Sequence, residues 1–452
     1  MAKITARTPK GMRDYLPADM LKREYVLGVI RDIFESFGFE PIDTPVLELR
    51  ETLMSSDYGE EAEKLIFFAQ HGGGGDEYAM RYDLTVPLSR FFASNENALS
   101  NPFRRYHIAP VWRGERPQKG RYREFYQCDA DIVGVRQTSA DAELMSIIYK
   151  ILNRLGFQEF TIKYNDRKLL IGIGIYAGVN EDRLPSLYRI IDKTDKIGLD
   201  GVAQEFEKEG FSAEVIDRMM GILSFDGSGD TGARLVALGN LREELDSIEI
   251  AQEGLQELED LTSMIDQLGV PTTHTLMDFT MVRGLGYYTG PIFETIITKP
   301  DNLGSVQGGG RYDELIGRFR GQSLPNTGIS MGIDRIIELM EMLDLYPDWV
   351  KTGTVVQTLV TVFNDETLVD SMKVAQELRS AGLRVETYLD ARKSLGKQIG
   401  YADGKGIPVI AILGPDEVKT GTVNLKRLAD GEERSVARGD AAQEIKNLIK
   451  VE

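Results

Sequence analysis

The sequence has few residues that bind metals or form disulfides. It contains one cysteine, Cys128, and three histidines, His71, His107 and His274, which lie far apart along the chain. A single cysteine excludes an internal disulfide and any zinc site that needs several cysteines. Because the histidines are scattered, each is expected to be structural, and the sequence predicts no protein-bound metal.

Long apolar segments are also missing. The 452 residues contain no run of about 18 apolar residues, the length that a membrane-spanning helix requires. The N-terminal segment MAKITARTPKGMRDYLP has no apolar centre of the kind found in signal peptides. The hydrophobic content of 42% and charged content of 27% are ordinary for a soluble protein. We therefore expect a cytoplasmic protein of two or three domains, without a membrane partner.

Positive charge is in deficit. The formal net charge is −18, since 71 acidic residues outnumber 53 basic ones. This balance argues against non-specific binding to nucleic acid, which depends on neutralising phosphates. A chain of this charge that binds RNA must do so through local basic patches.

One such patch is conspicuous, in residues 104–134. Two strand-like runs, 106–112 and 123–133, flank a loop rich in glycine and proline, which predicts a long antiparallel hairpin. Seven basic residues crowd into its first twenty positions: Arg104, Arg105, Arg113, Arg116, Lys119, Arg121 and Arg123. Arginine is always charged and binds pairs of oxygens bidentately, so this pattern favours phosphate binding. A solvated hairpin with ion pairs is the alternative.

The order of residues in this hairpin supports the phosphate interpretation. Residues 111–117, VWRGERP, and 120–127, GRYREFYQ, resemble motif 2 of class II aminoacyl-tRNA synthetases, in the version of the histidyl-tRNA synthetase family. Residues 283–290, RGLGYYTG, resemble that family's histidine-specific signature, with Gly286 in place of the usual aspartate. The GGGRYD run at 308–313 and the opening KGMRDYLP at 10–17 also resemble it. The resemblance covers essentially the whole chain.

This resemblance implies an α/β (α+β) fold in two domains. A class II antiparallel-sheet catalytic domain would occupy residues 1–345 and contain a mainly helical insertion, about 171–270. A linker, 346–353, would lead to an α/β anticodon-binding domain, 354–452, where strands and helices alternate. The three class II motifs would lie at about 39–48, 104–134 and 325–340. The first builds the dimer interface in the family, so a homodimer is implied.

Periodicity adds predictions for individual elements. Apolar spacing predicts helices at about 19–37 and 140–158, and a proline-interrupted edge strand at 39–48. Residues 64–90 suggest a second hairpin, whose returning strand would run from Tyr78 to Thr85. Asp83 and Thr85 would then share one face of that strand. The acidic insertion could reach the acceptor stem of a tRNA, as in the family, or be a solvated helical spacer.

The resemblance implies ATP-dependent charging of histidine onto tRNA(His), with ATP as substrate and Mg²⁺ on its phosphates. Arg113 and Arg283 would be catalytic, holding the α-phosphate and carboxylate. Arg121 and Arg335 would bind the β/γ end of ATP, and Glu115 the adenine amino group. Gln118 and Arg123 would contact the tRNA acceptor end. The histidine-binding residues would be Asp83, Leu84, Thr85, Arg113, Gln127, Asp131, Arg283, Tyr287 and Tyr288.

Three other functions fit the sequence less well. A non-catalytic, histidine-binding paralogue, the regulatory subunit of ATP phosphoribosyltransferase, typically lacks the C-terminal domain and has lost arginines, whereas both are present here. An RNA-sensing domain without activity is disfavoured by the intact arginines. A class I synthetase is disfavoured because its HIGH-type and KMSKS-type motifs are missing. The sequence identifies no base for the transfer step.

Overall fold

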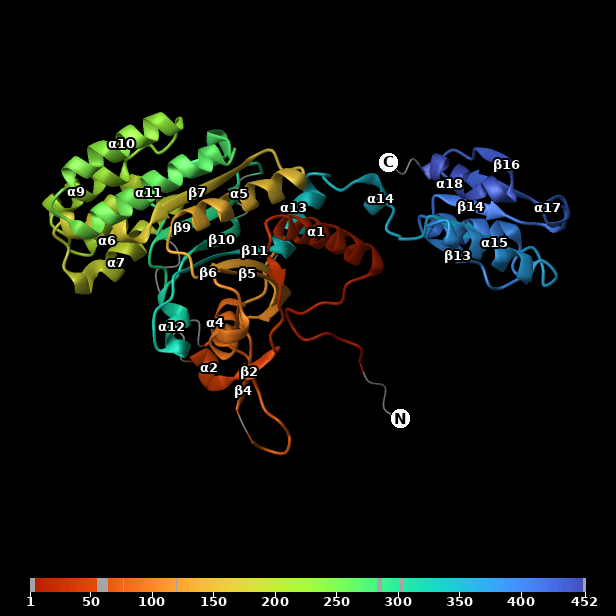
Figure 1. The fold of residues 1–452 in the computed structure, drawn as a ribbon, viewed down its shortest axis with the longest axis horizontal. Coiled ribbons are helices and arrows are strands. Elements are labelled where there is room, and N and C mark those ends of the chain that lie inside the picture. Colours follow the sequence, from red (N-terminus) through yellow and green to blue (C-terminus); the bar gives the residue numbers. More distant parts are fainter. Residues whose placement is uncertain are drawn as a thin grey trace. The chain divides into compact units, whose positions relative to one another are not determined.

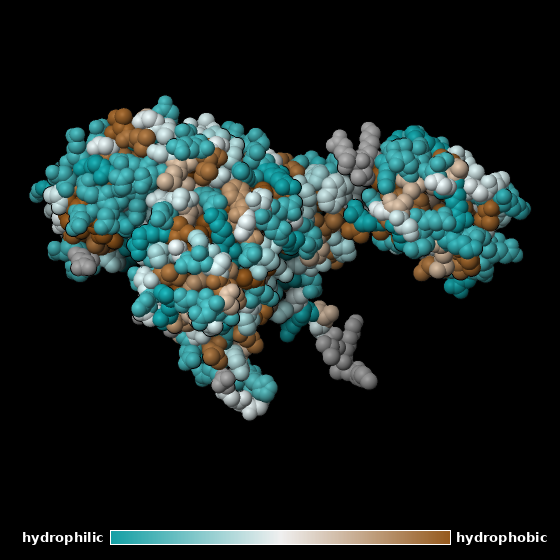
Figure 2. Space-filling view, in the orientation of Figure 1, coloured by the Kyte–Doolittle hydropathy of each residue, from teal (hydrophilic) through white to brown (hydrophobic). Residues whose placement is uncertain are grey.

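The computed structural model describes residues 5–54, 64–75, 77–118, 120–282, 287–300 and 304–449. The chain forms two compact units (Figure 1). The first consists of Met1–Arg13 and Val26–Leu345, and the second of Asp14–Tyr25 and Tyr346–Glu452. Among the described residues, no helix combines the length and apolar character needed to cross a membrane. In Figure 2 hydrophilic residues dominate the visible surface of each unit, as the acidic composition requires.

An eight-stranded, mainly antiparallel sheet forms the first unit's centre. Its strands in spatial order are β1 (Glu40–Pro41), β5 (Phe103–Trp112), β6 (Glu124–Val133), β11 (Asn326–Gly332), β10 (Ser305–Arg311), β9 (Pro291–Ile297), β7 (Phe160–Asp166) and β8 (Thr275–Met277). The two outermost pairs, β1–β5 and β7–β8, are parallel, and the others are antiparallel. β1 lies at the edge of the sheet. Pro41 suits this position because proline has no backbone N–H that would need a partner on the open side. The predicted hairpin is confirmed, whereas the edge strand predicted at 39–48 is present in this sheet only at Glu40–Pro41.

Alternation along β5 and β6 divides the hairpin between two faces. On β6, Cys128, Ala130 and Ile132 are fully buried, and α13 (Ile333–Met342) packs against this strand. The other face bears polar side chains in rows across three strands. Those rows are Arg105–Asp131–Gly328, His107–Asp129–Ser330 and Ala109–Gln127–Gly332. The central strands therefore present their polar residues together on one face of the sheet.

A three-stranded sheet and several helices surround this large sheet in the first unit. The small sheet has the order β2 (Leu47–Leu49), β4 (Tyr78–Met80), β3 (Phe68–Ala69). The helices of this part of the unit are α2 (Arg50–Met54), α4 (Thr85–Asn95), α5 (Ser139–Arg154), α12 (Glu314–Arg320), α13 and the portion of α1 (Pro17–Ser36) that begins at Val26. α5 buries Leu144, Ile147, Ile148 and Ile151 completely, which the apolar spacing of its sequence predicts.

The prediction of a strand from Tyr78 to Thr85 is wrong. β4 ends at Met80, and Thr85 begins α4. The Asp83 carboxylate accepts hydrogen bonds from the backbone N–H groups of Thr85 and Val86, at 3.2 and 3.1 Å. Pro87 is compatible with this helix because the first turn needs no backbone donor there. Asp83 and Thr85 therefore do not alternate along a strand.

Six helices between β7 and β8 form a separate group of the first unit. They are α6 (Arg167–Tyr176), α7 (Leu184–Ile191), α8 (Thr194–Lys208), α9 (Ala213–Leu223), α10 (Thr231–Glu244) and α11 (Glu249–Gln267). α6 packs on α7, α9 and α11, and α10 packs on α11 (Figure 1). Asp166 caps α6 by accepting from the backbone N–H of Lys168 at 2.7 Å. The segment that sequence predicts to be mainly helical consists of these helices.

The second unit contains a five-stranded mixed sheet. Its order is β13 (Val385–Thr387), β12 (Thr358–Val360), β14 (Val409–Ile412), β15 (Thr422–Arg427), β16 (Glu433–Ala437). Its main helices are α15 (Leu368–Ser380), α16 (Leu395–Gly404) and α18 (Ala441–Ile449). α15 and α18 contribute Val374, Leu378 and Ile445 to a core with Val360 and Val409. The alternation of strand-like and helix-like segments in the sequence predicted the elements of this unit except β16 and α17 (Pro415–Thr420). Both have polar sequences that give a weak periodic signal.

Candidate active site

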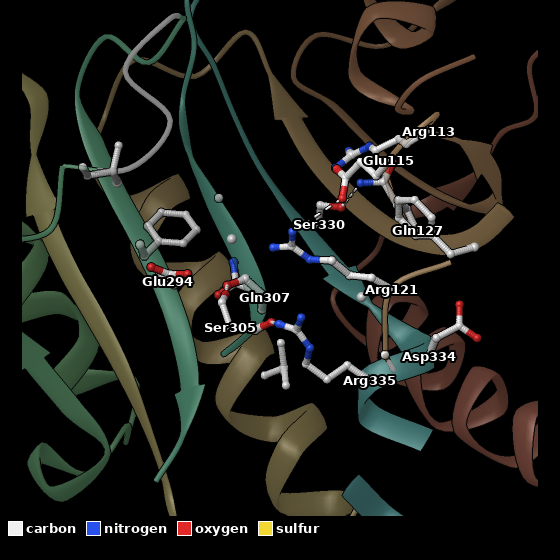
Figure 3. A pocket seen from close by; sticks show the side chains of 18 of the residues that line it. Arg113, Glu115, Arg121, Gln127, Glu294, Ser305, Gln307, Ser330, Asp334 and Arg335 are labelled. Carbon is white, nitrogen blue, oxygen red and sulfur yellow. Dashed lines mark hydrogen bonds and ion pairs between the residues drawn. The ribbon is translucent and has the colours of Figure 1, made fainter. Parts of the chain in front are cut away.

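A pocket of about 370 Å³ lies on the polar face of the large sheet (Figure 3). The motif 2 loop, β6, β9, β10, β11 and the start of α13 contribute to its wall. Its charged and polar side chains are those of Arg113, Glu115, Arg121, Tyr122, Gln127, Tyr287, Tyr288, Glu294, Ser305, Gln307, Ser330, Asp334 and Arg335. Seven of these were predicted as site residues, so the structure brings that set together from distant parts of the chain.

The Arg113 side chain is held at the pocket by a backbone carbonyl and by two aromatic rings. Its guanidinium lies over the rings of Tyr82 and Phe125, with centroid distances of 4.4 and 5.1 Å. Its Nε donates to the Tyr82 carbonyl at 3.2 Å. These contacts leave its terminal nitrogens toward the pocket that it lines. A cation fixed in this way can meet an anionic ligand without reorganising.

Two further arginines face the same space. Arg121 forms an ion pair with Glu115 at 3.5 Å across the motif 2 loop. Arg335, in the first turn of α13, donates to the Ser305 carbonyl (Figure 3). The residues assigned to motif 3 form β11 and the following helix α13. Three arginines on one pocket favour a polyanionic ligand.

Gln127 offers the pocket a hydrogen-bond acceptor. Its Nε2 donates to Ser330 Oγ at 2.8 Å, which orients the amide. The opposite atom, Oε1, is buried and accepts no hydrogen bond from any residue in the described part of the chain. An oriented, unpaired amide oxygen suits an ammonium group of a ligand.

The two tyrosines of the RGLGYYTG signature are packed against each other at the pocket. Their ring centroids are 4.5 Å apart, and the Tyr287 hydroxyl lies 3.5 Å from that of Tyr288. Burial raises the pKa of Tyr287 to about 12 and raises the pKa of Tyr288 well above its ordinary value. Both phenols are therefore neutral hydrogen-bonding groups near neutral pH.

Asp131 belongs to a fully buried cluster beside the pocket. Arg105 pairs with it at 2.7 Å, and the Tyr312 hydroxyl donates to it. A Cβ on Gly328 would lie 1.9 Å from Asp131 Oδ1, so glycine is required where this side chain crosses β11. Burial raises the pKa of Asp131 despite the nearby arginine. Asp131 does not line the pocket wall itself, but lies in the sheet row next to that of Asp129 and Ser330.

Asp129, which the sequence analysis did not select, lies in the same cluster. Burial raises its pKa to about 7, with Asp131 adding a like charge and Arg105 opposing the shift. The folded protein therefore holds a proton that the unfolded chain releases near pH 4. Stability from this group is full below the unfolded pKa of 3.8 and is lost as the pH rises toward 7.

Asp129→Asn is expected to remove this loss, because the amide stays neutral at every pH while keeping the shape of the side chain. The variant should be more stable than the wild type above about pH 7, by up to about 4 kcal/mol, and similar to it near pH 4. Urea unfolding at about pH 4 and about pH 8 measures both differences. A variant that is less stable at the higher pH would show that Arg105 needs an ionised Asp129.

The remaining predicted residues lie in different places. Leu84 is buried against Ala109 and Val111, so its side chain belongs to the core. Gln118 forms a tight turn with Arg121 at the tip of the motif 2 loop. Arg123 donates from Nε to the Glu115 carbonyl at 3.0 Å. Arg283 and Gly286 lie outside the described residues.

Several lining residues escaped sequence reasoning. Ser330 lies within motif 3, and its position opposite Asp129 becomes apparent only from the register of β6 and β11. Glu294, on β9, ends the stretch that resembles the histidine-specific signature but was assigned no role, and Gln307 lies on β10 just before the three glycines. The alternation of β11 is the one signal that could have placed Ser330 on the ligand face.

The three glycines of GGGRYD have different surroundings. A Cβ on Gly308 meets nothing within 4 Å, and Gly308 lines the pocket. A Cβ on Gly309 would lie 2.4 Å from the Gly328 carbonyl oxygen and 2.6 Å from the Phe293 ring. We expect Gly309→Ala to destabilise the sheet, by about 1–3 kcal/mol. Gly308→Ala should fold normally but place a methyl group in the pocket, which thermal melts and ligand titrations of both variants would separate.

Comparisons with known proteins agree with this geometry. The sequence profile of the histidyl-tRNA synthetase family matches residues 11–336, and that of the anticodon binding domain matches residues 357–448. The histidine–tRNA ligase of Aeropyrum pernix is 43% identical over 451 residues, covering 99% of this chain and all of the relative. That of Phocaeicola vulgatus is 39% identical over 449 residues, covering 95% of this chain and 96% of the relative.

Solved structures give the same result. The crystal structure of histidyl-tRNA synthetase from Nostoc sp. PCC 7120 superposes with a TM-score of 0.89 at 35% identity, covering 98% of this chain and 100% of that chain. The fold is thus a class II aminoacyl-tRNA synthetase catalytic domain, with a mainly antiparallel sheet, joined to an α/β anticodon-binding domain. The chain belongs to the histidyl-tRNA synthetase family.

Proposed function

We propose that this chain activates histidine with ATP and transfers it to tRNA(His). The observation that carries the proposal is the convergence of Arg113, Arg121 and Arg335 on the pocket that Gln127 and Tyr288 also line. Adenylate formation needs one cavity that binds both an amino acid and a triphosphate. Family membership over both units supports the same reaction.

The first step is in-line attack of the histidine carboxylate on the α-phosphorus, with pyrophosphate leaving. It needs positioning and charge neutralisation rather than a covalent protein group. Arg113, fixed between Tyr82 and Phe125, would hold the carboxylate and α-phosphate. Arg121 and Arg335 would bind the β- and γ-phosphates. Arg121 would then leave its ion pair with Glu115, and the Glu115 carboxylate would accept a hydrogen bond from the adenine amino group. Arg283, which is outside the described residues, is proposed as a second catalytic cation.

Mg²⁺ is proposed to accompany ATP. Among the described residues no three or more His, Cys, Asp or Glu side chains are grouped to hold a metal, so the phosphates would supply most of its ligands. Glu294 is the pocket carboxylate, besides Glu115, that suits a hard cation, since Asp334 is paired with Arg13. When bound, the ion would neutralise charge on the departing pyrophosphate.

Histidine selection is proposed to depend on the polar face of the sheet. The unpaired Oε1 of Gln127 would accept from the ammonium group, together with Asp83 and Thr85 at the start of α4. Tyr288 and Asp131 would satisfy the two imidazole nitrogens, with Leu84 and Tyr287 shaping the subsite. A site that pairs both ring nitrogens strongly rejects amino acids without them.

The transfer step would bring the tRNA to both units. Gln118 and Arg123 of the motif 2 loop are proposed to contact the acceptor end, and the domain beginning near residue 354, after a linker at 346–353, to bind the anticodon. Helices α6–α11 are proposed to be an insertion in a catalytic domain of residues 1–345. Either a protein group or a phosphate oxygen would accept the ribose proton.

A homodimer is also proposed. Val46, Leu47, Leu49 and Phe68 are 40–53% exposed on or beside the small three-stranded sheet that follows motif 1. Leu47 and Leu49 share one face of this sheet, whereas Phe68 lies in the row of Glu48 and Ala79. Exposed apolar groups on one face are typical of an interface. Sedimentation analysis should give twice the chain mass of 50.5 kDa. A monomer at micromolar concentration would contradict the proposal.

Histidine-dependent exchange of pyrophosphate with ATP tests the proposed function directly. Each of the common amino acids is assayed separately with the full chain and Mg²⁺. Exchange with histidine alone, followed by charging of tRNA(His), is the expected result. Histidine binding without exchange would contradict the ligase proposal and support the regulatory alternative.

A further inference from the structure

The N-terminal segment before α1 touches the motif 2 loop at two points. The Gly11 carbonyl accepts from the backbone N–H of Arg123 at 2.8 Å. Gly11 has φ +84°, and a Cβ there would lie 2.8 Å from Pro117 Cγ and 2.9 Å from Arg123 Cγ. Glycine is therefore required both by the backbone conformation and by the close approach. The loop that carries Arg113 and Arg121 thus rests on a segment more than a hundred positions earlier in the chain.

Arg13 connects that loop to the helix of motif 3. Its guanidinium lies 3.5 Å from the ring centroid of Tyr122 and forms an ion pair with Asp334. The Tyr122 hydroxyl donates to Glu338 at 3.2 Å, one turn further along α13 than Asp334. A planar guanidinium suits this position because it can stack on a ring and bind a carboxylate at once.

The charges explain why a cation is needed at this position. Asp334 is 5% exposed, lines the pocket and immediately precedes Arg335. An unpaired carboxylate here would repel the phosphates that the arginines are proposed to bind. Arg13 offsets that charge from outside the pocket wall, since Arg13 is not among the lining residues.

We propose that Arg13 is a positioning residue for the triphosphate end of ATP. It holds the motif 2 loop against α13, so that Arg121 and Arg335 keep their separation, and it neutralises Asp334. This inference rests on the proposed function, because it assigns a task within the same reaction. It concerns ATP and not histidine, whose proposed subsite lies around Gln127 and Tyr288.

The test compares Arg13→Ala and Arg13→Lys with wild type in pyrophosphate exchange. Arg13→Ala should raise the KM for ATP on the order of tenfold while the KM for histidine changes by less than about twofold. Arg13→Lys keeps the charge and loses the stack on Tyr122, so its KM for ATP should lie between the two. Arg7→Ala is the matched control, because Arg7 is an exposed arginine of the same segment.

A second variant separates positioning from general destabilisation. Adding Asp334→Asn to Arg13→Ala removes the negative charge that Arg13 offsets in the wild type, and should recover part of the ATP affinity. Equal ATP KM values for Arg13→Ala and wild type would overturn the inference, as would parallel increases for ATP and histidine. If Arg13→Ala does not fold, Arg13→Lys and the double variant decide on the same criteria. Failure of wild type to exchange at all would instead overturn the proposed function.

Discussion

Arg113→Ala is expected to lower the rate of histidine-dependent pyrophosphate exchange by about 10²–10³-fold, the usual effect of removing one fixed group that stabilises transition-state charge. The side chain is oriented by Tyr82 and Phe125 before any ligand arrives, so its loss removes a preorganised cation. Single-turnover adenylate formation, measured at saturating ATP and histidine, separates this effect from weaker binding.

Arg116→Ala is the matched control for that experiment. Arg116 is an exposed arginine of the same loop and does not line the pocket. Its loss changes the net charge of the loop by the same amount and should leave exchange within about twofold of wild type. Equal losses in both variants would mean that the loop acts through its overall charge, and Arg113 would have no special role.

Arg311→Met is expected to reduce the free energy of unfolding of the first unit by about 3–5 kcal/mol, as is usual when one partner of a buried ion pair is removed. Arg311 pairs with the fully buried Asp141 at 2.5 Å and donates to the carbonyls of Val135 and Gln137. Methionine fills the space but leaves the carboxylate of Asp141 without a cation. The arginine of GGGRYD thereby joins β10 to α5, away from the pocket.

The chain's two tryptophans allow this unit to be followed alone. Trp112 is buried in β5 and Trp349 is half exposed in the second unit. In a Trp349→Phe background, urea unfolding followed by fluorescence reports on the first unit. Arg318→Met, a change at an exposed arginine of α12, should shift the midpoint little. Restored stability in Arg311→Met with Asp141→Leu would confirm that the unpaired carboxylate is the cause.

Local patterns predicted local structure well. The alternation of 106–112 and 123–133 and the turn residues between them were sufficient for β5 and β6, and helical spacing was sufficient for α1 and α5. The strand predicted around Asp83 was wrong. An aspartate and a proline at these positions fit the start of a helix, but they also fit a short extended segment. Packing against other segments decides between the two structures, and the local sequence does not show that packing.

Contacts between distant segments could not be predicted. Arg105, Asp131 and Gly328 share a row because of the register between β5, β6 and β11, and no local pattern sets that register. The same holds for Ser330 beneath Gln127 and for Arg13 beside Asp334. Motif resemblance identified many residues of the pocket, whereas their partners became visible only in the folded chain.

The two faces of β6 have a consequence for how this hairpin can vary among relatives. Gln127, Asp129 and Asp131 face one way, and Cys128, Ala130 and Ile132 the other. A single inserted or deleted residue within the strand would exchange the two sets, burying carboxylates against α13 and exposing apolar groups to the ligand. A change in length outside the two strands, in the loop that contains Gln118 and Arg121, leaves this division of the two faces intact.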